Sequence, residues 1–198
     1  MAAMNFKEIE DKWQHRWEER KIFDADIGSV KKFFLSVPYP YTSGPLHIGH
    51  GRTYTLGDII ARFKRLQGYN VLFPMAFHVT GTPILAIADS IAKGEEAVVA
   101  RYNDYIAIYE GAAKVKEIVS SFGKPENVAN FFADRISDDF KRMGYSIDWR
   151  RKFNTTEPMY NKFIEWQFKK LYDKGVITKG KYPITYSIDD KSAVGEDD

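Results

Sequence analysis

Two of the chain's four histidines, His47 and His50, lie three residues apart directly behind a turn that is rich in proline and glycine. Side chains at this spacing share one face of a helix, and here they fall in its first turn. The first turn of a helix has unpaired N–H groups and a partial positive charge, which favour phosphate. Two imidazole donors there would stabilise the negative charge that develops on phosphorus under attack. The pair therefore indicates a site for ATP whose α-phosphate is attacked.

The neighbouring glycines fit the same interpretation. Gly49 removes a side chain between the histidines, which would let a flat base or a ribose approach the backbone. Gly44 and Pro45 shape the turn into the helix. Two other interpretations stay open at this point: either ring could simply cap the helix, or the pair could bind a metal. A metal site would need a third ligand, for which His78 is the available histidine.

The composition narrows the class of protein. The chain has 198 residues, of which 44% are hydrophobic and 15% aromatic, enough for a soluble globular domain with a real core. It has no cysteine, so disulfides and thiolate zinc sites are excluded. No P-loop, G-x-G-x-x-G or G-x-S-x-G motif occurs. No segment has the length of a membrane span, and the first residues are too charged for a secretory signal, so we expect a cytoplasmic protein.

Hydrophobic patterns predict the elements that position the histidines. Residues 32–37 are typical of a buried strand, residues 69–73 of a second strand, and a helix begins between them at about residue 46. This order is typical of a βαβ unit, which should be parallel and right-handed. Gly68 is the expected C-terminal stop of the helix. One side of the helix carries an apolar stripe, made of Leu56, Ile59, Ile60, Phe63 and Leu66.

The remaining sequence is mostly helical in pattern. Residues 6–17 predict an amphipathic helix with an apolar stripe that we assign to the core, made of Phe6, Ile9, Trp13 and Trp17. Further helices are expected over residues 84–92, 127–143 and 157–174, a helical insertion over 94–123, and short strands over 176–178 and 184–187. The predicted fold class is α/β with an open parallel sheet. Three of the four histidines follow its strands, where ligands bind in such sheets.

Three stretches resemble the class I aminoacyl-tRNA synthetases. His47-Ile48-Gly49-His50 spells the HIGH signature of that family, and the match extends through YPYTSGPLHIGHGRTYTLGDIIARFKRLQGYNVLFPMAFHVTGTPI, which resembles the leucine-specific enzymes of the archaeal and eukaryotic branch. FKEIEDKWQHRWEERKIF is similar to the lead-in of the leucine, isoleucine and valine enzymes. SIDWRRKFNTTEPMYNKFIEWQFKKLYDKGVI is similar to the segment before their editing insertion. The resemblance covers nearly the whole chain and is weakest over residues 94–123.

The resemblance implies a role for each site residue. His47 and His50 match the catalytic histidines that hold the ATP phosphates, and with Gly44 and Gly49 they form the implied ATP-binding set. The implied amino-acid pocket is lined by Tyr39, Pro40, Tyr41 and His78. His78 departs from the pattern of the bacterial leucine enzymes and their isoleucine relatives, which carry an aspartate there that holds the substrate ammonium. Histidine cannot supply that negative charge, so a neutral imidazole nitrogen or a backbone carbonyl would have to accept the hydrogen bond.

The resemblance also implies the architecture. The expected fold is an incomplete Rossmann-like catalytic domain with a lead-in helix over residues 1–30, a first βαβ unit over 31–93, the insertion over 94–123 and a later segment over 124–198. Nothing matches the second family signature, K-M-S-K-S, whose lysine stabilises the leaving pyrophosphate. We therefore expect the N-terminal part of a longer enzyme, inactive by itself and ending where the editing insertion begins. A frayed natural C-terminus is the alternative.

The activity that the resemblance implies is activation of leucine with ATP to leucyl-adenylate, followed by transfer to tRNA(Leu). Mg²⁺ is expected to accompany ATP, and no zinc site is expected. Two alternatives remain open: a class I synthetase for methionine or isoleucine, and a non-catalytic RNA-binding module descended from a synthetase.

Overall fold

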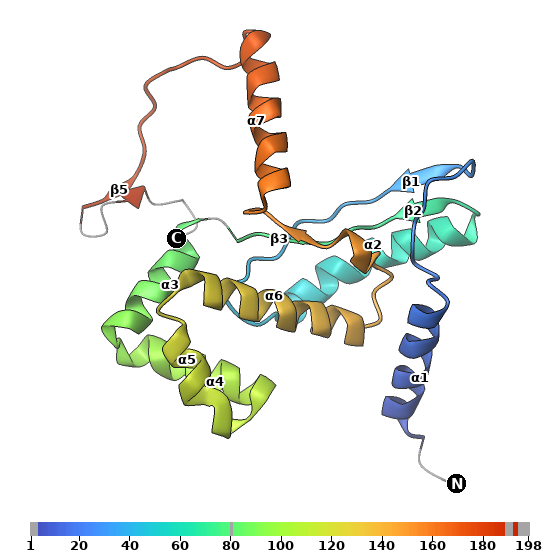
Figure 1. The fold of residues 1–198 in the computed structure, drawn as a ribbon, viewed down its shortest axis with the longest axis horizontal. Coiled ribbons are helices and arrows are strands. Elements are labelled where there is room, and N and C mark those ends of the chain that lie inside the picture. Colours follow the sequence, from blue (N-terminus) through green and yellow to red (C-terminus); the bar gives the residue numbers. More distant parts are fainter. Residues whose placement is uncertain (1–3, 80, 189–191, 194–198) are drawn as a thin grey trace. The chain divides into compact units, whose positions relative to one another are not determined.

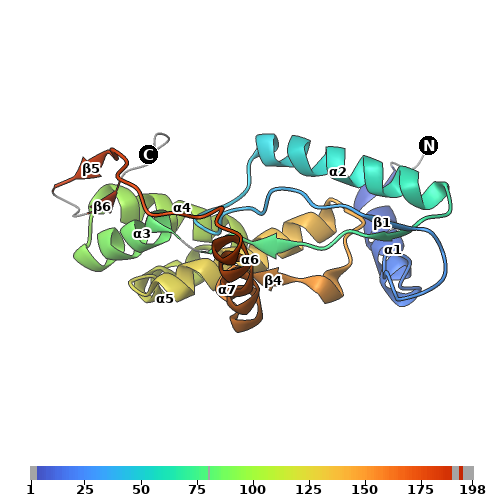
Figure 2. The ribbon, with the colours of Figure 1, turned by 90° about the horizontal axis from the view of Figure 1, so that it is seen from above.

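The predicted βαβ unit is present. In the computed structural model, which describes residues 4–79, 81–188 and 192–193, β1 (Lys32–Phe34) pairs in parallel with β2 (Asn70–Leu72), and α2 (Ile48–Leu66) connects them (Figures 1 and 2). Gly68 follows α2 with a φ of +82°, a left-handed conformation that suits glycine at a helix end. The first strand was predicted to be buried, and this is wrong, because Lys32 and Phe34 are exposed.

A second parallel pair continues the strand layer. β3 (Ala76–Phe77) pairs with β4 (Phe153–Asn154), and Tyr41 forms an isolated parallel bridge to His78. The α/β class with parallel strands is therefore confirmed, but the strands are shorter than predicted. Proline explains the interruption, because Pro74 stands between β2 and β3 and has no N–H to donate to a ladder.

Helices build most of the core. The elements after β3 are α3 (Thr82–Lys93), α4 (Glu96–Glu110), the 3₁₀ turn η1 (Ala112–Lys114), α5 (Val115–Ser121) and α6 (Pro125–Arg142). The segment over residues 94–123 is thus helical, as expected. Its side chains Tyr102, Ile106 and Phe122 join Phe132 and Ile136 of α6 in one buried cluster. A second short 3₁₀ turn, η2 (Trp149–Arg151), leads into β4.

The first helix, α1 (Phe6–Glu19), corrects a prediction. Its apolar stripe was assigned to the core, yet no residue of α1 is buried, and Phe6 and Trp13 are 67% and 45% exposed. Its contacts with the rest of the chain are concentrated at its C-terminal half, where Gln14 donates to the Arg142 carbonyl and the Trp17 ring lies against Gly144. The periodicity identified the helix correctly but wrongly placed its apolar side in the core.

The same distinction applies to α2. Every member of its predicted stripe is at least 45% exposed, whereas its buried residues are Tyr54, Gly57, Asp58 and Ala61. Gly57 shows why the helix face with small residues is the one that packs against the core. A Cβ added there would lie only 2.7 Å from the Val37 Cγ1 atom and 3.4 Å from the Phe73 ring. The core therefore approaches α2 across its small and polar residues.

A second compact unit begins at Pro158. It contains α7 (Pro158–Asp173), close to the predicted helix, and an antiparallel pair formed by β5 (Tyr186–Ser187) and β6 (Ser192–Ala193). The strand predicted over residues 176–178 is wrong, because that segment has no regular structure. The strand predicted over 184–187 is reduced to Tyr186–Ser187. None of the helices in the described part of the chain is long and apolar enough to cross a membrane.

Candidate functional site

His47 and His50 cap the N-terminus of α2. His47 is the N-cap residue, and its Nδ1 atom accepts a hydrogen bond from the Gly49 N–H at 3.1 Å. The His50 Nδ1 atom accepts one from the His47 N–H at 3.3 Å. Their ring centroids lie 4.0 Å apart. The capping interpretation of the pair is therefore a structural fact, and the two rings are held side by side by backbone donors.

Capping leaves the second nitrogen of each ring available. An imidazole whose Nδ1 accepts a hydrogen bond carries its proton on Nε2 when it is neutral, so that nitrogen is a donor. No hydrogen bond from either Nε2 atom occurs among the described residues. The arrangement thus presents two N–H donors beside a helix N-terminus. Capping and phosphate binding use different atoms and are compatible.

Partial burial lowers the pKa of His50 below its ordinary value of 6.5, and the nearby His47 lowers it further. Unfolded His50 therefore takes up a proton at a higher pH than folded His50. The free energy of unfolding should fall as the pH decreases from about 6.5 through the folded-state pKa, and His50 should have no such effect at higher pH.

Urea unfolding at about pH 8 and about pH 5 tests this expectation. The matched variant is His50→Gln, because glutamine caps from the same position but does not titrate. The wild-type chain should lose more stability than the variant over this interval. Equal losses would show that His50 does not contribute.

Gly49 is required by the His47 ring. A Cβ at position 49 would lie 2.8 Å from the His47 Cε1 atom and 3.0 Å from its Nδ1 atom. Gly49→Ala should therefore displace the ring and break its bond to the Gly49 N–H. Stability should change little, because the lost cap costs about 1 kcal/mol and alanine in a helix returns a similar amount.

Gly51→Ala is the control for this prediction, because a Cβ there meets only the Ile48 Cδ1 atom, at 3.9 Å. The signals of the His47 ring in a proton–nitrogen spectrum should move in Gly49→Ala and stay in place in Gly51→Ala. Movement of equal size in both variants would contradict the steric explanation.

Gly44 is different, because its backbone is not left-handed and an added Cβ would make only an ordinary contact, 3.6 Å from the Tyr105 ring. The structure therefore gives no steric reason for glycine at this position.

The four residues of the predicted amino-acid pocket lie together. The His78 N–H donates to the Pro40 carbonyl at 2.9 Å, and the His78 and Tyr41 rings stack at 4.3 Å. Tyr39 packs edge-on against Phe153 at 5.6 Å. Because Tyr41 is 51% exposed, one side of this cluster is open. The parallel bridge between Tyr41 and His78 explains the proximity, since it places the two residues side by side.

Sequence reasoning missed three residues in or around the segment between β1 and α2: Thr42 within it, and Tyr54 and Tyr102, which hydrogen-bond to its backbone. Thr42 is fully buried, and its hydroxyl has no partner among the described residues. Tyr54 donates its hydroxyl to the Pro38 carbonyl, and Tyr102 donates to the Ser43 carbonyl. The position of Tyr54, one turn after His50 in the same helix, was a usable signal. Tyr102 lies 59 residues from its acceptor and gave no local signal.

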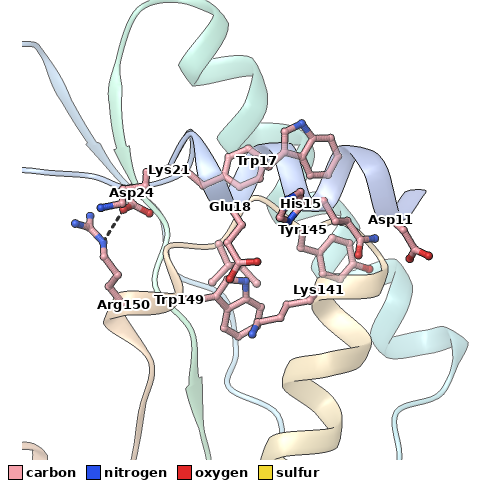
Figure 3. Close-up of a pocket in the computed structure, with 14 residues that line it drawn as sticks. Asp11, His15, Trp17, Glu18, Lys21, Asp24, Lys141, Tyr145, Trp149 and Arg150 are labelled. Carbon is pink, nitrogen blue, oxygen red and sulfur yellow. Dashed lines mark ion pairs between the residues drawn. The ribbon is translucent and has the colours of Figure 1, made fainter. Parts of the chain in front are cut away.

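A separate cavity of about 470 Å³ lies beside α1 (Figure 3). Its aromatic lining consists of Trp17, Phe23, Tyr145 and Trp149, and the Lys141 ammonium lies 5.6 Å from the centre of the Trp149 ring. Arg150 at its edge pairs with Asp24 at 3.2 Å. None of the site residues predicted from the sequence lines this cavity.

Comparisons with known proteins identify the family. The family model for tRNA synthetases class I (I, L, M and V) matches residues 12–197. Leucine–tRNA ligase of Staphylothermus marinus is 57% identical over 97% of this chain and 20% of its own length, and that of Thermoplasma acidophilum is 50% identical over 96% and 21%. The structure of the Agrobacterium radiobacter K84 agnB2 LeuRS-tRNA-LeuAMS ternary complex is similar with a TM-score of 0.67, at 27% identity over 93% of this chain and 20% of that one.

The chain thus spans about one fifth of the length of these relatives. The model match covers residues of both units of the structure, and the match to the leucine enzymes covers 96 to 97% of the chain. This chain belongs to the class I tRNA synthetases of the isoleucine, leucine, methionine and valine group.

Proposed function

We propose that the chain is the ATP- and leucine-binding part of a leucine–tRNA ligase. The single observation that carries the proposal is the capping geometry of His47 and His50, which engages both Nδ1 atoms and leaves both Nε2 donors for a ligand. The identity to leucine–tRNA ligases supports leucine, rather than methionine or isoleucine, as the amino acid.

In the proposed reaction a carboxylate oxygen of leucine attacks the α-phosphorus of ATP. The bond from that phosphorus to the bridging oxygen of pyrophosphate breaks, which yields leucyl-adenylate and pyrophosphate. Negative charge grows on the α-phosphate oxygens during attack, and His47 and His50 would donate hydrogen bonds to it. The α2 N-terminus adds the partial positive charge of its free N–H groups.

The amino-acid end of the site would be the cluster around His78. A neutral His78 nitrogen or the carbonyls of the adjoining backbone would accept hydrogen bonds from the leucine ammonium. Tyr39 and Tyr41 would line the pocket with aromatic surface. No group of three His, Asp or Glu side chains suited to a metal occurs in the part of the chain that the structure describes, so Mg²⁺ would be held by the phosphates of ATP.

The experiment uses the complete product of the reading frame that encodes this sequence. ATP–pyrophosphate exchange should be strongest with leucine, by roughly ten- to two-hundredfold in kcat/KM over isoleucine and methionine. A preference for isoleucine or for methionine would identify the chain as part of the synthetase for that amino acid instead. Tight binding of RNA without exchange for any amino acid would favour the non-catalytic module.

The isolated chain of 198 residues should not catalyse this exchange. No K-M-S-K-S lysine is present to stabilise the departing pyrophosphate, and such electrostatic stabilisation is usually the largest catalytic contribution. The measurement is leucine-dependent exchange by the purified chain, with heat-denatured protein as background. Exchange well above that background would contradict the prediction.

A further inference from the structure

Two buried tyrosine hydroxyls hold the ends of one short segment. Residues 38–43, which we call the pocket segment, lie between β1 and α2. They include Tyr39, Pro40 and Tyr41 of the proposed leucine pocket. The Tyr54 hydroxyl donates to the Pro38 carbonyl at the start of the pocket segment, at 3.0 Å. The Tyr102 hydroxyl donates to the Ser43 carbonyl at its end. Both tyrosines are only 3% exposed.

The pocket segment needs such support because little regular structure fixes it. Pro38 and Pro40 have no N–H, so they cannot donate to a ladder. Its contribution to the strand layer is the single bridge at Tyr41, with the bond from the His78 N–H to the Pro40 carbonyl. The two tyrosine hydroxyls therefore anchor its ends on either side of that central contact.

Tyr54 connects both halves of the proposed site. It stands one helical turn after His50, and the two rings are nearly parallel, with an interplanar angle of 7° and centroids 6.5 Å apart. The Tyr54 ring also packs against the Phe140 ring, with centroids 4.5 Å apart. Burial raises the pKa of Tyr54 to about 12, so its hydroxyl remains a donor at neutral pH. One rigid side chain thus adjoins a phosphate-binding histidine and holds the start of the leucine-binding segment.

Through Tyr102, the helical insertion over residues 94–123 supports the pocket segment. Tyr102 lies on α4, and its ring packs on Phe122 and Phe132 at 6.1 and 5.9 Å. Burial raises the pKa of Tyr102 strongly, which keeps this hydroxyl protonated as well. The insertion therefore presents one donor, fixed by an aromatic core, to the backbone of the pocket segment.

We propose that Tyr54 and Tyr102 are positioning residues that fix the pocket segment in the conformation that binds the amino acid. This inference rests on the proposed function for its substrate, but not for its structural content. Neither hydroxyl needs to touch leucine or ATP. Each acts by holding a backbone carbonyl, so its loss should weaken leucine binding more than ATP binding.

The experiment compares Tyr54→Phe, Tyr102→Phe and Tyr109→Phe, each of which keeps the ring and removes the hydroxyl. Tyr109 is the matched control, because it lies on the same helix as Tyr102 and its hydroxyl bonds instead to Asp139, at 2.9 Å. In the complete gene product, the first two variants should raise KM for leucine about tenfold, the scale of one lost buried hydrogen bond, with KM for ATP within about twofold. Tyr109→Phe should leave both constants unchanged.

Hydrogen exchange by the isolated chain gives a second readout that does not depend on activity. Peptides that cover residues 38–43 should exchange faster in Tyr54→Phe and Tyr102→Phe than in Tyr109→Phe. Unchanged exchange there would overturn the inference, and so would a KM for leucine equal to that of the control in an active enzyme. A wild-type protein that fails to activate leucine would overturn the proposed function instead, while faster exchange would still support the anchoring role.

Discussion

Replacing His50 with alanine in the complete gene product should lower the rate of leucyl-adenylate formation by about a hundredfold or more, the scale for losing one preorganised donor. The Nε2 donor of His50 is oriented by the bond that its Nδ1 atom accepts from the His47 N–H. Because the charge it stabilises grows only during attack, kcat and kcat/KM should fall together while KM for ATP stays nearly constant. Pre-steady-state adenylate formation measures this directly.

The capping bond makes a second effect inevitable, and a second variant separates the two. His50→Ala also removes a cap, which should cost about 1 kcal/mol of stability. His50→Glu keeps a capping acceptor at the same helical position but places a negative charge beside the phosphates. It should melt near the wild-type temperature and still lose the activity. A His50→Ala enzyme that melts early yet forms adenylate at the normal rate would reduce His50 to a cap.

Asp58→Ala should destabilise the isolated chain by about 2 kcal/mol, mainly because it leaves a buried N–H group without its partner, while the pair with Arg62 adds less because the Arg62 side chain is 38% exposed. The Asp58 carboxylate accepts from the Ser146 N–H at 2.6 Å and from the Arg62 Nε at 2.7 Å, and the residue is only 8% exposed. Arg65 completes the contact by donating to the Ser146 hydroxyl and carbonyl. Without the carboxylate, the Ser146 N–H is buried without a partner and Arg62 loses its counter-charge.

Asp89→Ala is the matched control, because Asp89 also forms an i,i+4 pair on a helix, with Lys93, but both side chains are more than 60% exposed. Exposed pairs of this kind contribute about 0.5 kcal/mol. Urea unfolding of the two variants should therefore differ severalfold in lost free energy. Equal losses would mean that Asp58 contributes no more than a surface charge.

Local sequence patterns predicted the helices and the parallel βαβ unit because each has a short-range cause. The stop of α2 at Gly68 follows from a left-handed backbone that glycine tolerates. The proximity of Tyr41 and His78 follows from parallel pairing, which brings residues after neighbouring strands together. These features depend on the nearest residues or on a general rule of topology.

The buried faces of α1 and α2 were predicted less well. Hydrophobic periodicity shows that a helix has an apolar face and a polar face, but it does not show which other elements pack against each face. In α2 the inward face was decided by Gly57 and Asp58, which suit a close backbone approach and a buried hydrogen bond from the backbone of a distant segment. Tyr102 was missed for the same reason, since its acceptor lies far away in the sequence. The HIGH histidines were found easily, but their nitrogen assignments required the capping geometry.

The cavity beside α1 determines what the chain's own fluorescence can report. Three of its four tryptophans, Trp13, Trp17 and Trp149, line hollows next to that helix, and the fourth, Trp166, belongs to the second unit. At the α2 N-terminus, the rings in contact with His50 are those of His47 and Tyr54. Emission from these three indoles is therefore a gauge of how α1 is seated, and an extrinsic dye is the better reporter of nucleotide binding. In one sample, tryptophan emission can therefore follow α1 while the emission of the dye follows the ligand.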